Sequence, residues 1–425
     1  MSEMILDQAS EADLKSLVEE RFGHEPQWSL ALRQSAAAAV LNLDWPRLER
    51  TPLKKRKLDQ LHLFKAPPTP SRTAAAAPEG WAEIWLDNNQ VVAVSMPEAL
   101  SLQGVRLESL TAALDDPDVE KHLGRLLGQD ADKIAALSGA LWQGGVFLRV
   151  PARIREVVRV SIRSHATAEA GALFAKNLII CGAESHVTVT QRLATDEGVS
   201  KTLLSENTEI IVEDGGRVDF GAIQQCAPTV EGFIHRAGAL GHDAVLNWSI
   251  GEFGAGLVVS DHVSHLDQPG AQTSSTTVFF GAGTQHQDYS AKSYHHAPHT
   301  TSNMVARGVM KNKARSVFTG LTQIEAGAKG SDGRQKEQTL MLSDDARADA
   351  IPSLIIDERD VYAAHAASAG PVDRAAVFYL TSRGLSEPEA ERIIVHGFLA
   401  PVIDAIALPE LRDEVWDAVE RKIRA

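Results

Sequence analysis

The strongest constraint on the fold lies in the middle of the chain, between residues 144 and 356. Short runs of β-branched and aliphatic residues recur here, and Gly, Asp, Asn and Ser separate them. Several runs alternate: Val187 and Val189 would point to one side of a strand, and their polar neighbours to the other. No helical pattern of ordinary length interrupts the series. The region is therefore expected to consist of many short strands.

Three architectures accommodate so many short strands: a sandwich, a barrel, and a solenoid in which the strands coil. A weak repeat favours the solenoid. An apolar run, a Gly-containing turn and an alternating run recur in residues 177–189, 209–220 and 237–250. The spacing is irregular, about 25 to 35 residues, as expected for coils joined by loops of different length. On these patterns alone the other two architectures remain open.

Helical patterns flank the strand-rich region on both sides. Ser10 is expected to cap a helix near the start of the chain. Ser386 and Glu389 have the spacing of a capping box. The last helix is expected to bury an apolar stripe with one residue in every turn: Leu411, Val415, Val419 and Ile423.

These patterns predict three domains. Residues 1–143 form a mostly helical N-terminal domain that contains a small hairpin at 81–94 and a flexible linker near 66–80, where Pro, Ala and small polar residues dominate. Residues 144–370 form the strand-rich core, and residues 371–425 form a helical C-terminal domain.

Composition excludes several classes of function. The formal charge of −14 argues against a general nucleic-acid binder. The basic run 47–57 fits a solvated surface better than a docking patch for an acidic partner.

The two cysteines, Cys181 and Cys226, exclude a Cys-rich metal site made by this chain alone. Both are expected to be buried, inert thiols. With no leader-like N-terminus and no membrane-length apolar run, the expected location is the cytoplasm.

Four histidines form the densest group of metal-ligand side chains: His286, His295, His296 and His299. Neutral imidazole binds several transition metals, but these spacings match no zinc template. Adjacent strand residues face opposite ways, so His295 and His296 would not easily bind one ion. The pattern favours polar residues on the outer face of a strand and turn.

Three acidic residues, Asp344, Asp345 and Asp349, resemble the carboxylates of a polysaccharide-cleaving solenoid enzyme. That chemistry needs two carboxyl groups at a set separation in a sugar-sized groove. Only 5% of the chain is aromatic, so little is available for a sugar-binding platform. We regard this as the weaker hypothesis.

The C-terminal part of the chain carries a family resemblance. Residues 293–373, from SYHHAPHTTSN to AAHAASAGPVD, and residues 378–404, FYLTSRGLSEPEAERIIVHGFLAPVID, resemble the SufB/SufD family of iron–sulfur cluster assembly proteins. The likeness is strong from about Tyr289 onward and weaker upstream. The tract is long and its order is specific.

The resemblance implies a mainly β protein, with a right-handed parallel β-helix core flanked by N-terminal and C-terminal helical domains. It therefore selects the solenoid. It also implies a non-catalytic scaffold subunit in iron–sulfur cluster biogenesis, within the SufBCD complex. The β-helix would pair with a SufB-like paralogue, and the C-terminal helices would bind a SufC-like ABC-type ATPase that rearranges this interface. The isolated subunit would hold no tightly bound cofactor, and a transient Fe–S cluster would form in the complex.

One site residue is implied by the resemblance. Family members of the SufD branch place a histidine in a C-S-H-G-A-like motif at the SufB interface, and His365 takes this place in the segment Ala363–Ala367. Ala363 stands where many relatives carry cysteine. An imidazole alone is a poor anchor for an Fe–S cluster, because thiolates dominate such sites. His365 is thus expected to be one cluster ligand or a proton relay, with the other ligands on the partner chain and no metal on the isolated chain.

The same comparison favours the SufD branch over SufB. SufB carries a cysteine where this chain has Ala346, and an E-H-E-A segment where this chain has residues 364–367, AHAA. Two other hypotheses remain. One is an enzyme acting alone, either a carbohydrate-active β-helix or a His-dependent metalloenzyme. The other is a homodimer that uses the same β-helix edge on itself, which is expected when the partner is missing because an unpaired edge invites association.

Overall fold

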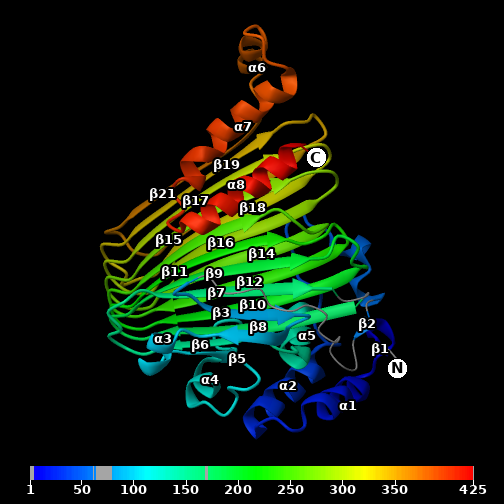
Figure 1. Cartoon of the computed structure of the whole chain (residues 1–425), viewed down its shortest axis with the longest axis vertical. Coiled ribbons are helices and arrows are strands. Elements are labelled where there is room, and N and C mark those ends of the chain that lie inside the picture. The colour runs from blue at the N-terminus through cyan, green and yellow to red at the C-terminus, as the bar shows by residue number, and fades with distance from the viewer. Residues whose placement is uncertain (1–3, 61, 64–78, 168–170, 425) are drawn as a thin grey trace.

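The computed structural model of the chain describes residues 4–60, 62–63, 79–167 and 171–424. Over these residues the protein is mainly β, and its strands form two long sheets (Figure 1). From β6 onward, consecutive strands alternate between the sheets, so that each coil of the chain gives one strand to each sheet. The described residues form eight such coils. The prediction of a parallel β-helix with helices at both ends is confirmed, and the sandwich and the barrel are excluded.

The first sheet contains nine strands in the order β20-β18-β16-β14-β12-β10-β8-β6-β5. Neighbouring strands pair in parallel, except that β5 pairs antiparallel with β6. The strands are β5 (Arg106–Ser109), β6 (Val146–Val150), β8 (Gly171–Cys181), β10 (Thr202–Val212), β12 (Val230–Leu240), β14 (Leu257–Leu266), β16 (His286–His295), β18 (Arg315–Ile324) and β20 (Arg347–Ile356).

The second sheet contains ten strands in the order β21-β19-β17-β15-β13-β11-β9-β7-β3-β4. Only the β3–β4 hairpin at its end is antiparallel. The strands are β3 (Ala82–Asp87), β4 (Gln90–Ser95), β7 (Val158–Ala166), β9 (His186–Thr195), β11 (Arg217–Gln225), β13 (Val245–Glu252), β15 (Gln272–Gly281), β17 (Thr301–Met310), β19 (Asp332–Met341) and β21 (Tyr362–Pro371).

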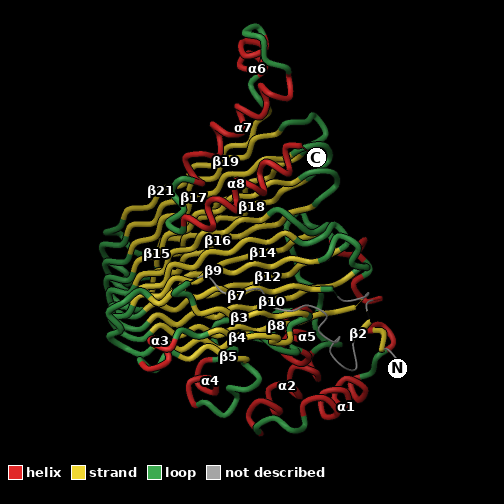
Figure 2. The backbone as a smooth tube through the Cα atoms, in the orientation of Figure 1, coloured by secondary structure: helices red, strands yellow, loops and turns green. Residues whose placement is uncertain are grey.

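Each strand of the coil pairs with the strand of the next coil without a register shift. The offset between paired residues ranges from 26, between Glu231 and Leu257, to 32, between Arg315 and Arg347. The predicted spacing is therefore confirmed. Loops of different length absorb the differences at the two sides of the sheets, where the turns gather (Figure 2). As a result, equivalent positions of successive coils stack in columns.

The N-terminal helices pack on the outer face of the first sheet. Apolar residues of these helices form one buried cluster with residues of β6, β8, β10, β12 and β14. The predicted cap at Ser10 is confirmed, because its hydroxyl accepts a hydrogen bond from the Asp13 amide at 3.2 Å. The elements are β1 (Met4–Ile5), η1 (Leu6–Gln8), α1 (Glu11–Phe22), α2 (Gln27–Ala39), η2 (Leu53–Arg56), η3 (Leu58–Gln60), β2 (His62–Leu63), α3 (Glu98–Leu102), α4 (Pro117–His122) and α5 (Lys133–Leu141).

Segments that precede residue 144 cover the first coil of the β-helix. Leu100, Val105 and Leu107 belong to the buried cluster that fills the interior of the first coils. The predicted hairpin exists as β3 and β4, and β3 also pairs in parallel with β7, so both long sheets begin before the proposed boundary at residue 143. Most of the predicted linker lies in residues 64–78, outside the described residues.

Three helices follow the β-helix: α6 (Arg374–Thr381), α7 (Glu387–Ile403) and α8 (Pro409–Arg424). The predicted capping box at Ser386 and Glu389 is present. Helices α7 and α8 lie along the outer face of the second sheet, and α6 extends beyond its last strand (Figure 1). In the described part of the chain, no helix has the length and apolar content needed to cross a membrane.

The second sheet is shaped to receive α8. A Cβ added at Gly221 would lie 2.5 Å from Leu408, and one at Gly251 would lie 3.2 Å from Val415, so glycine lets the helix approach closely. Arg192 of β9 forms two hydrogen bonds of 2.8 Å from Nε to the carboxylate of Glu414. The apolar stripe of α8 therefore packs against this chain's own sheet.

Val415→Asp is expected to lower the free energy of unfolding by about 3 kcal/mol or more, because it places an unpaired carboxylate where the side chain is fully buried. Urea unfolding followed by circular dichroism measures the change. Ala405→Asp is the matched control, since this residue is exposed between α7 and α8. Equal stability of the two variants would contradict the packing described for α8.

Candidate functional site

The two ends of the β-helix differ. The described chain covers the first coil with β3, β4 and β5, but nothing in it pairs with the outer edges of β20 and β21. Large apolar side chains are exposed near these edges, with Tyr362 at 76%, Ile355 at 46% and Ile356 at 42% exposure. An unpaired strand edge offers backbone N–H and C=O groups to another chain. The last coil is therefore the candidate functional site.

The two edges are not equivalent. β20 carries Pro352 at its centre, which has no N–H to donate, and proline is one means by which edge strands resist pairing. β21 has no proline before its last residue, Pro371. Most of its side chains are those of alanine, glycine and serine, so another backbone can come close. β21 is the better template for edge pairing.

The strand register fixes the direction in which His365 points. His365 pairs with Gln335 of β19, which pairs with Met304 of β17. Both of these residues are buried, and Gln335 donates a hydrogen bond of 2.8 Å to the carbonyl of Ser353 on β20, in the opposite sheet. Residues aligned in register share a face of the sheet. His365 therefore faces the interior side and is exposed only because its coil is the last.

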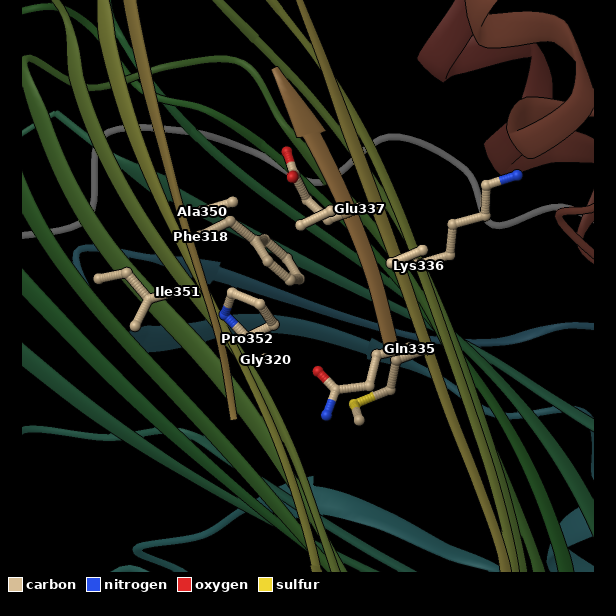
Figure 3. A pocket seen from close by; sticks show the side chains of 11 residues that line it. Phe318, Gly320, Gln335, Lys336, Glu337, Ala350, Ile351 and Pro352 are labelled. Carbon is tan, nitrogen blue, oxygen red and sulfur yellow. The ribbon is translucent and has the colours of Figure 1, made fainter. Parts of the chain in front are cut away.

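The coil beneath His365 has a polar interior. Gln335 and Glu337 lie on the same side of β19 as Phe318 and Pro352, around a small cavity, whereas Lys336 points the opposite way (Figure 3). Burial raises the pKa of Glu337 to about 7. Sequence reasoning did not single out either side chain, although their alternation with the exposed Lys336 was the available signal.

Two buried atoms of this layer lack hydrogen-bond partners. The Thr339 hydroxyl donates to Glu337 Oε1, but Glu337 Oε2 is unpaired, and so is Gln335 Oε1. Unpaired buried oxygens destabilise a fold. The layer beneath the last coil is therefore polar and incompletely hydrogen-bonded.

The predicted histidine group does not converge on one ion. His286 Nε2 lies 2.8 Å from the Thr51 hydroxyl, and His299 lies in a turn with φ 60°. His295 is fully buried, with its ring nitrogens 2.7 Å from the Thr300 hydroxyl and 2.8 Å from that of Ser302. The expectation that all four lie on an outer face is therefore wrong for His295, which points into the interior.

His296 points outward, as the alternation predicted. Its Nε2 lies 3.3 Å from Nδ1 of His265, one coil earlier in the chain. Sequence reasoning did not single out His265. The available signal was a separation of 31 residues, which is two more than the 29-residue offset between β14 and β16.

The three acidic residues do not form a facing pair of carboxyl groups. Asp344 and Asp345 are exposed in the turn between β19 and β20. Asp349 accepts hydrogen bonds from Arg50 at 2.8 Å and from Arg347 at 3.1 Å. This arrangement gives no support to polysaccharide cleavage.

The basic run 47–57 contacts its own chain. Besides the pair between Arg50 and Asp349, Arg56 lies 3.5 Å from Glu231 of β12. The run therefore spans from β20 to β12 along the first sheet. Two residues of the run, which sequence reasoning assigned to solvent, therefore form intramolecular ion pairs.

Neither cysteine is placed for sulfur or metal chemistry. Cys181 and Cys226 are free thiols, and both are buried. Burial raises the pKa of Cys181 to about 12, and it raises the pKa of Cys226 further. The thiolate is the nucleophile and the metal ligand, so both groups are inert in the folded protein. The expectation of buried, inert thiols is confirmed.

Comparison with known proteins agrees with this geometry. A family profile described as "SUF system FeS cluster assembly, SufBD core domain" matches residues 163–398. The iron–sulfur cluster assembly protein SufD of Bacillus subtilis (strain 168) is 31% identical, over 97% of this chain and 97% of its own. SufB of the same organism is 27% identical, over 91% and 88%. An iron–sulfur cluster assembly SufBD family protein of Staphylococcus aureus (strain USA300) is 28% identical, over 74% and 68%.

Stability is expected to fall as the pH rises through the range in which Glu337 ionises. The folded protein keeps this proton up to about pH 7, whereas the unfolded chain releases it near the ordinary value of 4.5. The stabilisation that this proton gives the folded protein below pH 4.5 is therefore lost progressively as the pH rises to about 7. Glu337→Gln should therefore be more stable than the unmodified protein at pH 8, by on the order of 2 kcal/mol, with the difference vanishing towards pH 4.

Urea unfolding of both proteins between pH 4 and pH 8 measures this difference. The exposed Glu20→Gln serves as the control and should follow the unmodified protein throughout. Two parallel curves for Glu337→Gln and the unmodified protein would show that Glu337 ionises in the same range in both states.

Proposed function

This chain belongs to the SufB/SufD family of iron–sulfur cluster assembly proteins, and from that premise we propose that it is a non-catalytic scaffold subunit. It pairs through the open end of its β-helix with a SufB-like paralogue and holds His365 at the joint. The observation that carries the proposal is the last coil. Its edge strands are unpaired within the described chain, and its inward-facing column ends in an exposed imidazole.

Pairing through β21 would continue the second sheet into the partner. The strand offers ten residues of edge, and its small side chains let a second backbone approach. The exposed Tyr362 at its start supplies an aromatic side chain of the kind that anchors protein interfaces. A second copy of the chain offers the same edge, so self-pairing competes with the paralogue when the paralogue is missing.

In the proposed complex His365 contributes one nitrogen ligand, or relays a proton, at a transient Fe–S cluster. Thiolate ligands would come from the partner, because Ala363 offers none and both cysteines are buried. The isolated subunit would hold no cofactor tightly.

The C-terminal helices would receive a SufC-like ATPase. Phe378 and Tyr379 of α6 are 74% and 57% exposed, and Ile393 of α7 is 48% exposed. The buried stripe of α8 joins these helices to the second sheet, whose last strand is β21. A force applied at α6 would thus reach the proposed joint through packed elements. The proposal places this work in the cytoplasm, a reducing compartment that suits two free thiols.

Ala364→Glu is expected to weaken pairing with a SufB-like partner at least tenfold, because a charge on an edge strand opposes pairing. Folding should be unaffected, since Ala364 pairs in register with the exposed Arg334. Size-exclusion chromatography of the mixed proteins and a titration of the affinity provide the measurement. Ala12→Glu, exposed on α1, is the matched control. Unchanged affinity of Ala364→Glu would exclude β21 from the interface.

His365→Ala is expected to keep its stability within about 0.5 kcal/mol and to bind the partner normally, since the side chain is exposed. Iron–sulfur cluster formation by the complex should fall severalfold, as measured by the rate at which cluster absorbance develops under anaerobic conditions. His242→Ala, in an exposed turn, is the control. Loss of folding would make His365 a structural residue, and full cluster formation would remove it from the site.

A further inference from the structure

One corner of the β-helix stacks ionisable residues from three successive coils. The last residues of β14, β16 and β18 are aligned in register. The chain leaves these strands through Asp267, His296 and Glu325, which therefore occupy equivalent positions of the three coils. His265, two residues before Asp267, is the outward-facing residue of β14 nearest to this corner. The corner lies on the side of the β-helix, on strands other than the edge strands β20 and β21.

Three of these side chains converge. His265 Nδ1 lies 3.3 Å from His296 Nε2, and Asp267 Oδ1 lies 3.8 Å from the same His296 nitrogen. All three ligand atoms lie within 4.8 Å of one another. Nitrogen–zinc bonds of about 2.0–2.1 Å place two ligands of a tetrahedral ion about 3.3 Å apart. The two imidazole nitrogens already have this separation, but the rings lie end to end, with centroids 5.6 Å apart and planes within 5°, so both rings must turn to direct their nitrogens at one ion. A rotation of the exposed Asp267 brings in the carboxylate.

A fourth side chain orients the central histidine. Glu325 Oε2 lies 2.9 Å from His296 Nδ1, so this nitrogen carries the proton and Nε2 presents its lone pair to the group. Histidines that bind metals generally donate their other N–H to a carboxylate or carbonyl in this way. The ring of Tyr294 is stacked near both imidazoles, at 5.2 Å from His265 and 6.1 Å from His296. The imidazoles are thus held before any ion arrives.

We propose that this corner binds one divalent first-row transition-metal ion through His265 Nδ1, His296 Nε2 and the carboxylate of Asp267. Water fills the remaining positions, because Asp267 and Glu325 are 44% and 41% exposed and leave the corner open to solvent. Two histidines and one carboxylate with open positions form the ligand set of non-haem Fe²⁺ sites, and Zn²⁺ accepts the same ligands. Magnesium and calcium are excluded, since they prefer oxygen ligands.

Binding needs the Asp267 side chain and both imidazole rings to rotate, and one proton to shift within a neutral ring. With the His296 proton held on Nδ1 by Glu325, the 3.3 Å contact in the empty site is a hydrogen bond from His265 Nδ1–H to His296 Nε2. When the ion enters, the His265 proton moves to Nε2 of the same ring. Both ring nitrogens that face the group then act as ligands, and no net proton is released.

The test uses the full-length, untagged chain, stripped of metal with a chelator. It is dialysed anaerobically against buffered Zn²⁺ in one arm and Fe²⁺ in the other, and the bound metal is counted. We expect one ion per chain and a rise in melting temperature with ion concentration. His296→Ala and His265→Ala should weaken binding at least a hundredfold. Glu325→Gln should weaken it about tenfold to a hundredfold, because it loosens the orientation of His296.

Two matched controls separate this site from the proposed cluster site. His365→Ala, on the open coil, and His299→Ala, in a turn of the same part of the chain, should both keep the ion. Retention by the unmodified protein no greater than that of the double variant His265→Ala/His296→Ala, with both proteins folded by circular dichroism, would overturn the proposal. So would loss of the ion in His365→Ala alone, since the binding would then belong to the open coil.

Discussion

The structure depends on the unshifted hydrogen bonding of each strand to the strand one coil later. Parallel pairing holds coil on coil along both sheets, and the loops at the two sides vary in length to preserve it. Because side chains alternate along a strand, an unshifted register forces equivalent residues into columns. A shift of one residue would turn Trp248 and Phe220, which lie in one buried column, to the outside. The apolar columns of the first coils therefore fix the register of the whole β-helix.

Along the axis of the β-helix, the residues in a column become more polar towards the open end. The column that contains Phe220 and Trp248 continues through Ser275 and Met304 and ends with Gln335 and His365. Apart from Met304, its apolar members lie in the first coils, where packing must supply stability. Its polar members lie near the open end. The apolar coils thus hold in place a terminal coil whose own contacts are few.

The sequence was sufficient for the strands, the hairpin at β3 and β4, the cap at Ser10, the capping box at Ser386 and the opposite directions of His295 and His296, because each of these follows from neighbouring residues. It was insufficient for contacts that span a coil. The meeting of His265 with His296, and of Thr51 with His286, depends on how many residues each loop absorbs. The weak repeat favoured coils over a sandwich or a barrel but did not align them. The direction of His365 depended on the same missing alignment, although the family resemblance marked the residue.

The open end is the least stable part of this arrangement, and that follows from its composition. The last strand, β21, is mostly alanine, glycine and serine and buries little apolar surface, so it is held mainly by hydrogen bonds to β19. Beneath it, Gln335 and Glu337 keep unpaired oxygens in a buried layer. If this coil contacted only solvent, an apolar layer and a covered edge, as at the other end, would make the protein more stable. In the proposed complex, a second protein would supply the missing strand and cover the polar layer.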